Sequence, residues 1–178
     1  MELDGKRVAV LAEASFEDLE LLYPLIRMRE AGAEAFVVGT GSAGNYTGKH
    51  GVPVQVDAEA DTVSAGQFDA IIVPGGWAPD RLRRYPSVLQ LVKDADEQGK
   101  VIGAICHAGW VLVSAQIVRG RTMTCVKAIK DDVTNAGAIF VDQEVVRDGN
   151  LVTSRTPEDL PAFCRELIKA IAANTARA

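Results

Sequence analysis

The fold is decided by residues 101–110, which read VIGAICHAGW. The apolar part of this stretch predicts a buried strand, and a helical pattern follows the cysteine and the histidine. Cys106 is therefore expected at a strand-to-helix turn, facing the N-terminus of the next helix. That end of a helix carries partial positive charge and unpaired N–H groups, which lower the pKa of a cysteine. The alternative is that Cys106 is only a small apolar side chain that fills the core.

Outward from this stretch, short apolar runs alternate with helical patterns along the chain. Strands are predicted at 7–12, 35–39, 70–73, 101–105, 122–125, 139–141, 144–146 and 151–153. Helices are predicted at 17–31, 79–96, 107–117, 129–136 and from Pro157 onward, with fraying from about Asn174. Between them, residues 43–57 alternate like a half-exposed strand after a polar turn, which indicates a small antiparallel excursion.

This alternation favours one α/β domain over residues 1–178. We expect a flavodoxin-like, doubly wound sheet of about six parallel strands, sandwiched by helices, with a small antiparallel hairpin as an appendage. The length fits a single domain, and no internal repeat or linker interrupts it.

Composition narrows the class of protein. Of the 178 residues, 48% are hydrophobic, and the formal net charge is −5. No cluster of lysine and arginine indicates a nucleic-acid or membrane partner, and no apolar run approaches the length of a membrane span. The N-terminus lacks the apolar region of a signal peptide, and the three cysteines are widely spaced, so we expect a cytoplasmic, reduced protein. Cys125 and Cys164 are expected to be packing residues.

Chemically active residues follow three of the predicted strands. Glu17 comes after the first strand, Gly75-Gly76 after the strand at 70–73, and Cys106-His107 after the strand at 101–105. Because ligands of doubly wound sheets bind at the carboxyl ends of the strands, these residues are expected to converge. Two histidines far apart and no clustered cysteines make a metal site improbable.

Several stretches of the chain resemble the PfpI branch of the ThiJ/PfpI superfamily, which is class I glutamine amidotransferase-like and includes intracellular protease I and general stress proteins. The matching stretches are 15–24, 47–51, 73–80, 104–107, 129–132, 135–137 and 152–155, in the family's order. Together they run across nearly the whole chain.

The resemblance implies a role for each of five residues. Cys106 matches the nucleophile, and Glu17 matches the buried acid that contacts it. His107 matches the histidine after the cysteine, while Gly76 and the His107 N–H match the oxyanion-hole positions. Asp80 stands where the family usually has a glutamate, supplied across a subunit interface, that orients the histidine. The bare sequence also allows Glu17 to be a first-turn acid favoured by the helix dipole.

The chain departs from the family pattern at two places. Ala108-Gly109-Trp110 follows the histidine where the family usually has Gly-Pro, which puts an aromatic ring near the pocket. Asp80 is one methylene shorter than the usual glutamate. Both changes bear more on histidine-dependent hydrolysis than on cysteine chemistry.

Together the residues and the resemblance predict a cysteine-dependent stress-response enzyme that attacks small reactive carbonyls or amides. Its reaction would be of glyoxalase or deglycase type, or a peptidase-type hydrolysis, and no cofactor is required. The alternative is a redox sensor or holding chaperone that acts through oxidation of Cys106. Expected partners are a small carbonyl, glycated or peptide substrate and further copies of the chain in a homodimer or larger homo-oligomer.

Overall fold

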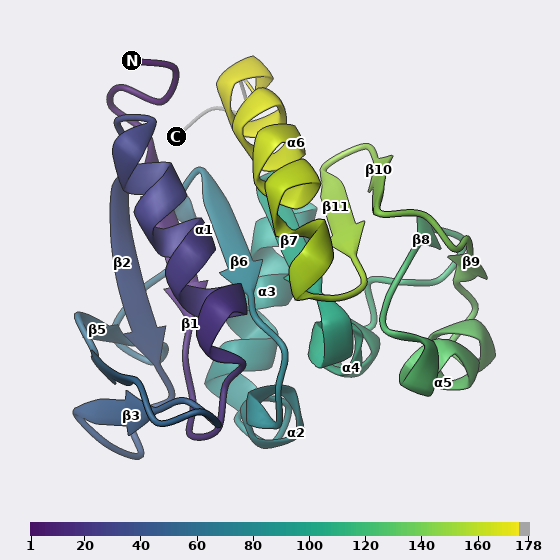
Figure 1. Ribbon diagram of the computed structural model, residues 1–178, viewed down its shortest axis with the longest axis horizontal. Helices are drawn as coiled ribbons and strands as arrows, with labels where there is room; N and C mark the ends of the chain where they lie inside the picture. Colours follow the sequence, from purple (N-terminus) through teal and green to yellow (C-terminus); the bar gives the residue numbers. More distant parts are fainter. Residues whose placement is uncertain (175–178) are drawn as a thin grey trace.

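The computed structural model describes residues 1–174, and its centre is one seven-stranded sheet (Figure 1). The strand order is β10-β11-β7-β6-β1-β2-β5, and all neighbours are parallel except β10 and β11. The strands are β1 (Arg7–Leu11), β2 (Glu34–Gly39), β5 (Ala58–Glu59), β6 (Ala70–Val73), β7 (Val101–Ile105), β10 (Val145–Asp148) and β11 (Leu151–Ser154). The expected doubly wound sheet with about six parallel strands is thus confirmed.

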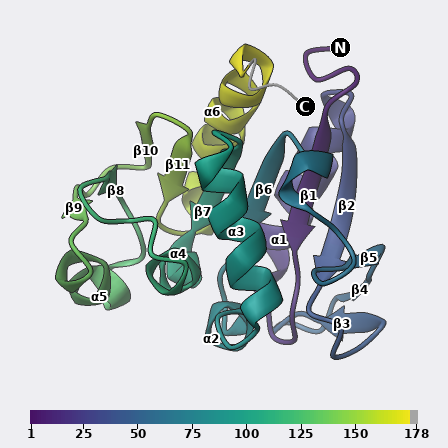
Figure 2. The ribbon, with the colours of Figure 1, turned by 180° about the vertical axis from the view of Figure 1, so that it is seen from behind.

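Helices cover both faces of this sheet. On one face lie α1 (Asp18–Glu30) and α6 (Leu160–Ala173), as Figure 1 shows. The other face carries α3 (Pro86–Glu97) and α4 (Gly109–Ser114), seen from behind in Figure 2. Because helices shield it on both sides, β7 is buried at all five of its positions.

Two small sheets lie outside the central one. The antiparallel pair β3 (Asn45–Thr47) and β4 (Pro53–Gln55) confirms the predicted hairpin appendage. The second pair is parallel, β8 (Thr122–Met123) with β9 (Ile139–Phe140), and α5 (Lys130–Asn135) lies beside it (Figure 1). Short 3₁₀ turns occur at Ala65–Gln67, Cys106–Ala108, Lys127–Ile129 and Pro157–Asp159.

The expectation of one helix over 79–96 was wrong. The chain forms α2 (Ala78–Leu82), breaks at residues 83–85 and continues as α3. Pro86 explains the break, because a proline disfavours helical geometry in the residue before it and is well suited to the first position of a helix. Tyr85 accordingly has an extended backbone, with φ −98° and ψ 112°.

Packing of the cysteine strand against α6 depends on Gly103. A β-carbon at this position would lie 2.8 Å from the end of the Leu167 side chain and 3.1 Å from the Phe163 ring, so the glycine lets both side chains pack directly on β7. Cys164, on the same helix, and Cys125 are almost fully buried, as expected of packing residues. Within residues 1–174 no helix is long and apolar enough to cross a bilayer. The fraying expected from about Asn174 falls on residues 175–178, which lie outside the described part.

Candidate active site

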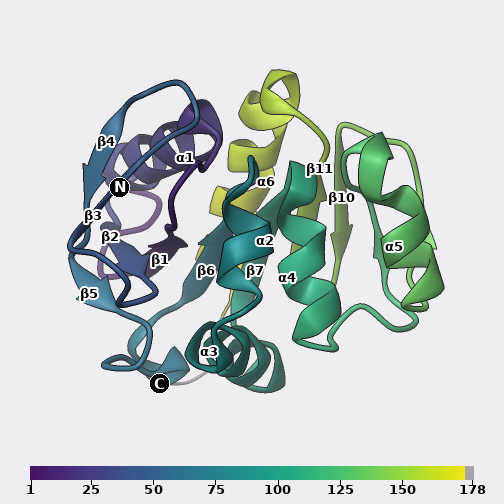
Figure 3. The same cartoon turned by 90° about the horizontal axis from the view of Figure 1, so that it is seen from below.

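Cys106 stands at the expected turn between β7 and α4. Its φ is +63°, in the left-handed region that L-residues other than glycine seldom adopt. Such a conformation costs about 1–3 kcal/mol and is typical of functional turns. The strand ends at Ile105, a 3₁₀ turn spans Cys106–Ala108, and α4 begins at Gly109. The side chain is half-buried at the carboxyl end of the sheet, where α2 and α4 lie side by side (Figure 3).

The sulfur of Cys106 accepts hydrogen bonds from two backbone N–H groups. They come from His107 and Gly76, and each lowers the pKa of the thiol. Gly76 has φ +75°, and a β-carbon there would collide with the backbone of Ser15 and Phe16 at 2.7 Å. An isolated bridge between Phe16 and Gly76 joins the same two segments. A glycine is therefore required for the turn after β6 to come this close.

The carboxyl group beside the thiol belongs to Glu20. Its Oε2 accepts the N–H of Gly75 at 2.8 Å, and the carboxyl lies within hydrogen-bonding reach of Cys106. Burial raises the pKa of Glu20 to about 8, and the negative charge of Glu17 adds to this rise. Glu20 is therefore protonated at neutral pH. Its second oxygen, Oε1, is buried without a hydrogen-bond partner among residues 1–174.

Glu20 and Cys106 titrate as a coupled pair. The lowered pKa expected for Cys106 is not found, because burial, together with repulsion from an ionised Glu20, raises the pKa of this thiol to about 12. Two negative charges are thus disfavoured, and the pair loses its first proton well before its second. The singly deprotonated pair has one proton for the two groups, and its reactive form is the one in which Glu20 keeps that proton and donates it to the thiolate.

The expectation that Glu17 contacts the thiol is not met by the structure. Glu17 is the N-cap of α1, and its Oε2 accepts the N–H of Glu20 at 2.9 Å. Its other oxygen faces His50 Nε2 at 3.7 Å. Glu17 thus caps the helix, and Glu20, one turn later, is the carboxyl beside the thiol. Glu17 instead acts on the thiol through Glu20.

His107 lies with its ring against the sulfur. Nδ1 is 3.3 Å from Cys106 Sγ. The ring is flanked by Trp77 and Trp110, with centroids 5.9 Å and 5.1 Å away. Burial lowers the pKa of His107, and the charge of Lys49 lowers it further, so the imidazole is neutral at pH 7. A neutral ring can take up a proton.

The two tryptophans around His107 differ in their surroundings. Trp110, from the stretch that departs from the family pattern, donates its Nε1–H to Asp132 at 2.7 Å, and Arg83 stacks over its ring. Trp77 is 60% exposed. The site therefore opens beside an exposed aromatic surface.

Asp80 is not brought to His107 within the chain. It lies in α2, and its half-exposed carboxylate pairs with Arg84, two residues past the end of that helix. Its expected action across a subunit interface stays a prediction.

Lys49 is a site residue that the sequence reasoning missed. It lies in the loop between β3 and β4, and its charge acts on both Glu20 and His107. The signal was present in the stretch 47–51, which reads TGKHG, but nothing in that pattern says where a loop lysine points. The backbone N–H of His50, from the same loop, donates to Asp18 at 2.9 Å.

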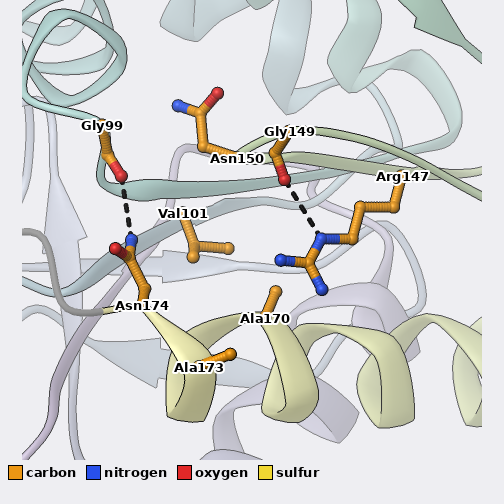
Figure 4. A pocket seen from close by; sticks show the side chains of 8 residues that line it. All are labelled: Gly99, Val101, Arg147, Gly149, Asn150, Ala170, Ala173 and Asn174. Atoms are coloured by element: carbon orange, nitrogen blue, oxygen red, sulfur yellow. Dashed lines mark hydrogen bonds between the residues drawn. The ribbon is translucent and has the colours of Figure 1, made fainter.

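A separate cavity of about 380 Å³ lies at the opposite end of β7 (Figure 4). Val101 lines it, and Val101 is the first residue of the strand that ends next to Cys106. The Arg147 and Asn174 side chains in this cavity donate to backbone carbonyls, of Gly149 and Gly99. None of the described residues that line it carries a nucleophilic side chain. Within residues 1–174 no three or more His, Cys, Asp or Glu side chains gather as a metal would require.

The chain is similar to known proteins over nearly its whole length. The chain is 45% identical over 163 residues to a deglycase of Thermococcus kodakarensis, covering 92% of this chain and 98% of that protein. It is 40% identical over 162 residues to YraA of Bacillus subtilis, named as a candidate cysteine protease, covering 91% and 96%.

A solved structure from Anabaena variabilis superposes with a TM-score of 0.92 at 39% identity. The match covers 97% of this chain and 50% of that one, which is described as a protein with a DJ-1/ThiJ/PfpI-like domain and a ferritin-like domain. The family model described as the DJ-1/PfpI family matches residues 6–170, so the chain belongs to the DJ-1/PfpI family.

Proposed function

We propose that the protein is a cysteine-dependent enzyme that attacks small reactive carbonyl compounds, with a glyoxalase- or deglycase-type reaction. The observation that carries this proposal is the environment of Cys106: a thiol on a strained turn, facing a protonated Glu20 and two backbone N–H groups. The deglycase name of a relative 45% identical to the chain supports it.

The first step is addition of the Cys106 thiolate to the aldehyde carbon of an α-oxo aldehyde. A C–S bond forms, and the carbonyl π electrons move to oxygen, which the N–H groups of Gly76 and His107 would hold. Removing one donor of such a pair commonly costs a factor of about 10²–10³ in rate. Glu20 passes its proton to this oxygen, which leaves a neutral hemithioacetal and a Glu20 carboxylate.

The second step moves hydrogen within the bound substrate. The Glu20 carboxylate, or the neutral His107 ring, takes the proton from the former aldehyde carbon, and the electrons shift to the neighbouring carbonyl. Return of a proton to that second carbon, with transfer of the hydroxyl proton from the first oxygen to the second, gives a 2-hydroxy thioester. Water then cleaves the C–S bond and releases the hydroxy acid and the thiol. Methylglyoxal plus water becomes lactic acid, so no external oxidant or cofactor is needed.

A deglycase reaction follows the same course on a carbonyl already joined to an amine. Here the C–N bond breaks and the amine leaves with a proton, before water releases the hydroxy acid. Glycated amino acids or proteins are therefore the second substrate class of this proposal.

Peptidase-type hydrolysis is a second candidate, favoured by one contact. His107 Nδ1 lies 3.3 Å from the Cys106 sulfur, a distance suited to passing a proton to a leaving amine. The name of YraA, 40% identical to the chain, supports this reading. It further requires an acid to orient the ring, and the proposed source is Asp80 of a neighbouring subunit in a homo-oligomer.

The alternative function, a redox sensor, would use the same Cys106 thiol in a different way. A sensor would show selective oxidation of Cys106 by graded peroxide together with altered assembly or partner binding. An enzyme would show oxidation only as inactivation. Mass spectrometry of the peroxide-treated protein, run beside size-exclusion chromatography, separates the two.

The test of the enzyme proposal compares three proteins on three substrates. Wild type, Cys106→Ala and Cys164→Ala are assayed with methylglyoxal, a glycated amino acid and a casein peptide. We expect the wild type to form lactate from methylglyoxal and Cys106→Ala to lose at least about 100-fold in turnover. Cys164→Ala should keep near wild-type turnover, because Cys164 lies on the buried face of α6. A Cys106→Ala protein with wild-type rates on all three substrates would overturn the proposal.

A further inference from the structure

Lys49 is held against the active site by its backbone. Its N–H donates to the carbonyl of Phe16 at 2.8 Å, and Phe16 forms the bridge with Gly76. The Lys49 backbone therefore contacts the residue next to Glu17, and through Phe16 it lies close to the turn after β6.

The loop that carries Lys49 is fixed by one carboxylate. Asp18 accepts the N–H of His50 at 2.9 Å through Oδ2 and that of Val52 at 3.0 Å through Oδ1. Gly48 packs directly on this carboxylate, since a β-carbon there would lie 2.5 Å from it. Asp18 is itself buried. The position of the Lys49 backbone is thus set by α1, the helix that also carries Glu20.

The ammonium group of Lys49 has no carboxylate partner of its own among residues 1–174. Its residue is exposed, and none of the ion pairs in this part of the chain includes it. Its charge nevertheless reaches Glu20 and His107. At neutral pH both of those groups are uncharged, and Glu17 faces His50 instead. Nothing in the described part of the resting site pairs directly with this cation.

We propose that Lys49 binds the negatively charged group of the substrate, so that the enzyme prefers α-oxo aldehydes that bear a carboxylate over neutral ones. The cation would hold the carboxylate while the aldehyde carbon lies at Cys106. This inference deepens the proposed function and rests on it for the identity of the substrate, and 4,5-dioxovalerate is a suitable probe. Its conversion to 2-hydroxyglutarate consumes one water, as the reaction of methylglyoxal does.

The deciding experiment does not depend on turnover. Cys106 is alkylated with iodoacetate, which is anionic, and with iodoacetamide, which is neutral and of nearly the same size. In both reactions sulfur displaces iodide, so any change in thiolate content cancels in the ratio of the two rates. Cys125 and Cys164 are buried, and Cys106→Ser supplies the blank.

Lys49→Met is expected to lower the iodoacetate-to-iodoacetamide ratio roughly fivefold, because one unit charge near the thiol is lost. Lys49→Arg keeps the charge and should keep the ratio within about twofold. Lys93→Met removes an exposed lysine of α3 as the matched control and should leave the ratio unchanged. An unchanged ratio in Lys49→Met overturns the inference.

Turnover then reports on the substrate class. We expect the ratio of kcat/KM for 4,5-dioxovalerate to that for methylglyoxal to fall about fivefold or more in Lys49→Met, mostly through KM. An equal loss on both substrates would overturn the inference, because Lys49 would then serve the catalytic groups and not the substrate's charge. Wild-type protein that converts neither compound would count against the proposed function, while the alkylation ratio would still decide the role of Lys49.

Discussion

Two carboxyl groups three residues apart at the start of α1 have different tasks. Glu17 caps the helix and remains next to His50, while Glu20 turns under the Gly75-Gly76 turn to meet the sulfur. The negative charge of Glu17 then raises the pKa of Glu20. Glu20 holds the proton that the reaction needs, and Glu17 helps to set the pH at which that proton is lost.

Glu17→Gln should therefore shift the pH profile and not abolish activity. Loss of the Glu17 charge makes it easier for the Glu20–Cys106 pair to lose its first proton, so the rise of kcat/KM with pH, expected near pH 8 in the wild type, moves to lower pH. Gln keeps a side-chain oxygen for the helix cap. The measurement is kcat/KM for methylglyoxal against pH, with Glu97→Gln on the exposed face of α3 as control. A profile that moves to higher pH, or does not move, would contradict this role.

At the residue scale, the sequence alone did not show which of Glu17 and Glu20 lies beside the sulfur. The helix was predicted from residue 17, which would place Glu17 in its first turn, but α1 begins at Asp18 and Glu17 is its N-cap. Even a shift of one residue in the start of a helix changes which acid faces the sheet. The position of Cys106 was predictable, because it directly follows the last residue of a buried strand.

At the scale of elements, the site is assembled from turns that follow β1, β6 and β7. Their meeting at the carboxyl edge follows from the parallel order, and it was predictable from the alternation of strands and helices. The pattern of strands and helices could not predict that Lys49 approaches the site. Its hairpin loop is held in place by hydrogen bonds to the Asp18 carboxylate. Loop placement depends on tertiary hydrogen bonds that leave no periodicity in the sequence.

Gly76 tests how tightly these turns must pack. Gly76→Ala forces a β-carbon into the backbone of Ser15 and Phe16 at a position with φ +75°. Gly120 has the same φ of +75°, but a β-carbon added there would meet no atom within 4 Å, so Gly120→Ala carries the backbone strain alone. We expect Gly76→Ala to lose about 2 kcal/mol or more beyond Gly120→Ala in denaturant unfolding, and to lose activity as well. Equal destabilisation of the two variants would refute the close-packed turn.

At the scale of the whole molecule, the buried Glu20 ties stability to pH. Its pKa is raised from 4.5 in the unfolded chain to about 8 in the fold. The folded state therefore binds the proton more tightly, and this stabilisation is full below about pH 4.5 and is lost as pH rises through about 8. Between pH 5 and pH 8 the loss amounts to about 4 kcal/mol at most.

Glu20→Gln cannot ionise and should lack this loss. The free energy of unfolding, measured by urea at pH 5 and pH 8, should fall more in the wild type than in the variant. The difference between the two proteins cancels contributions from His107 and from the other titrating groups. Parallel pH dependence in both proteins would mean that Glu20 is not a buried, protonated acid.

In the proposed mechanism Glu20 gives its proton to the substrate oxygen as Cys106 adds to the aldehyde, and steady-state turnover of methylglyoxal by Glu20→Gln is the decisive measurement. The amide fills the same space and can donate to sulfur, but it cannot exchange a proton. We expect kcat to fall at least about 100-fold while the protein stays folded and Cys106 is still alkylated by iodoacetamide. A Glu20→Gln protein that forms lactate at the wild-type rate would contradict this mechanism.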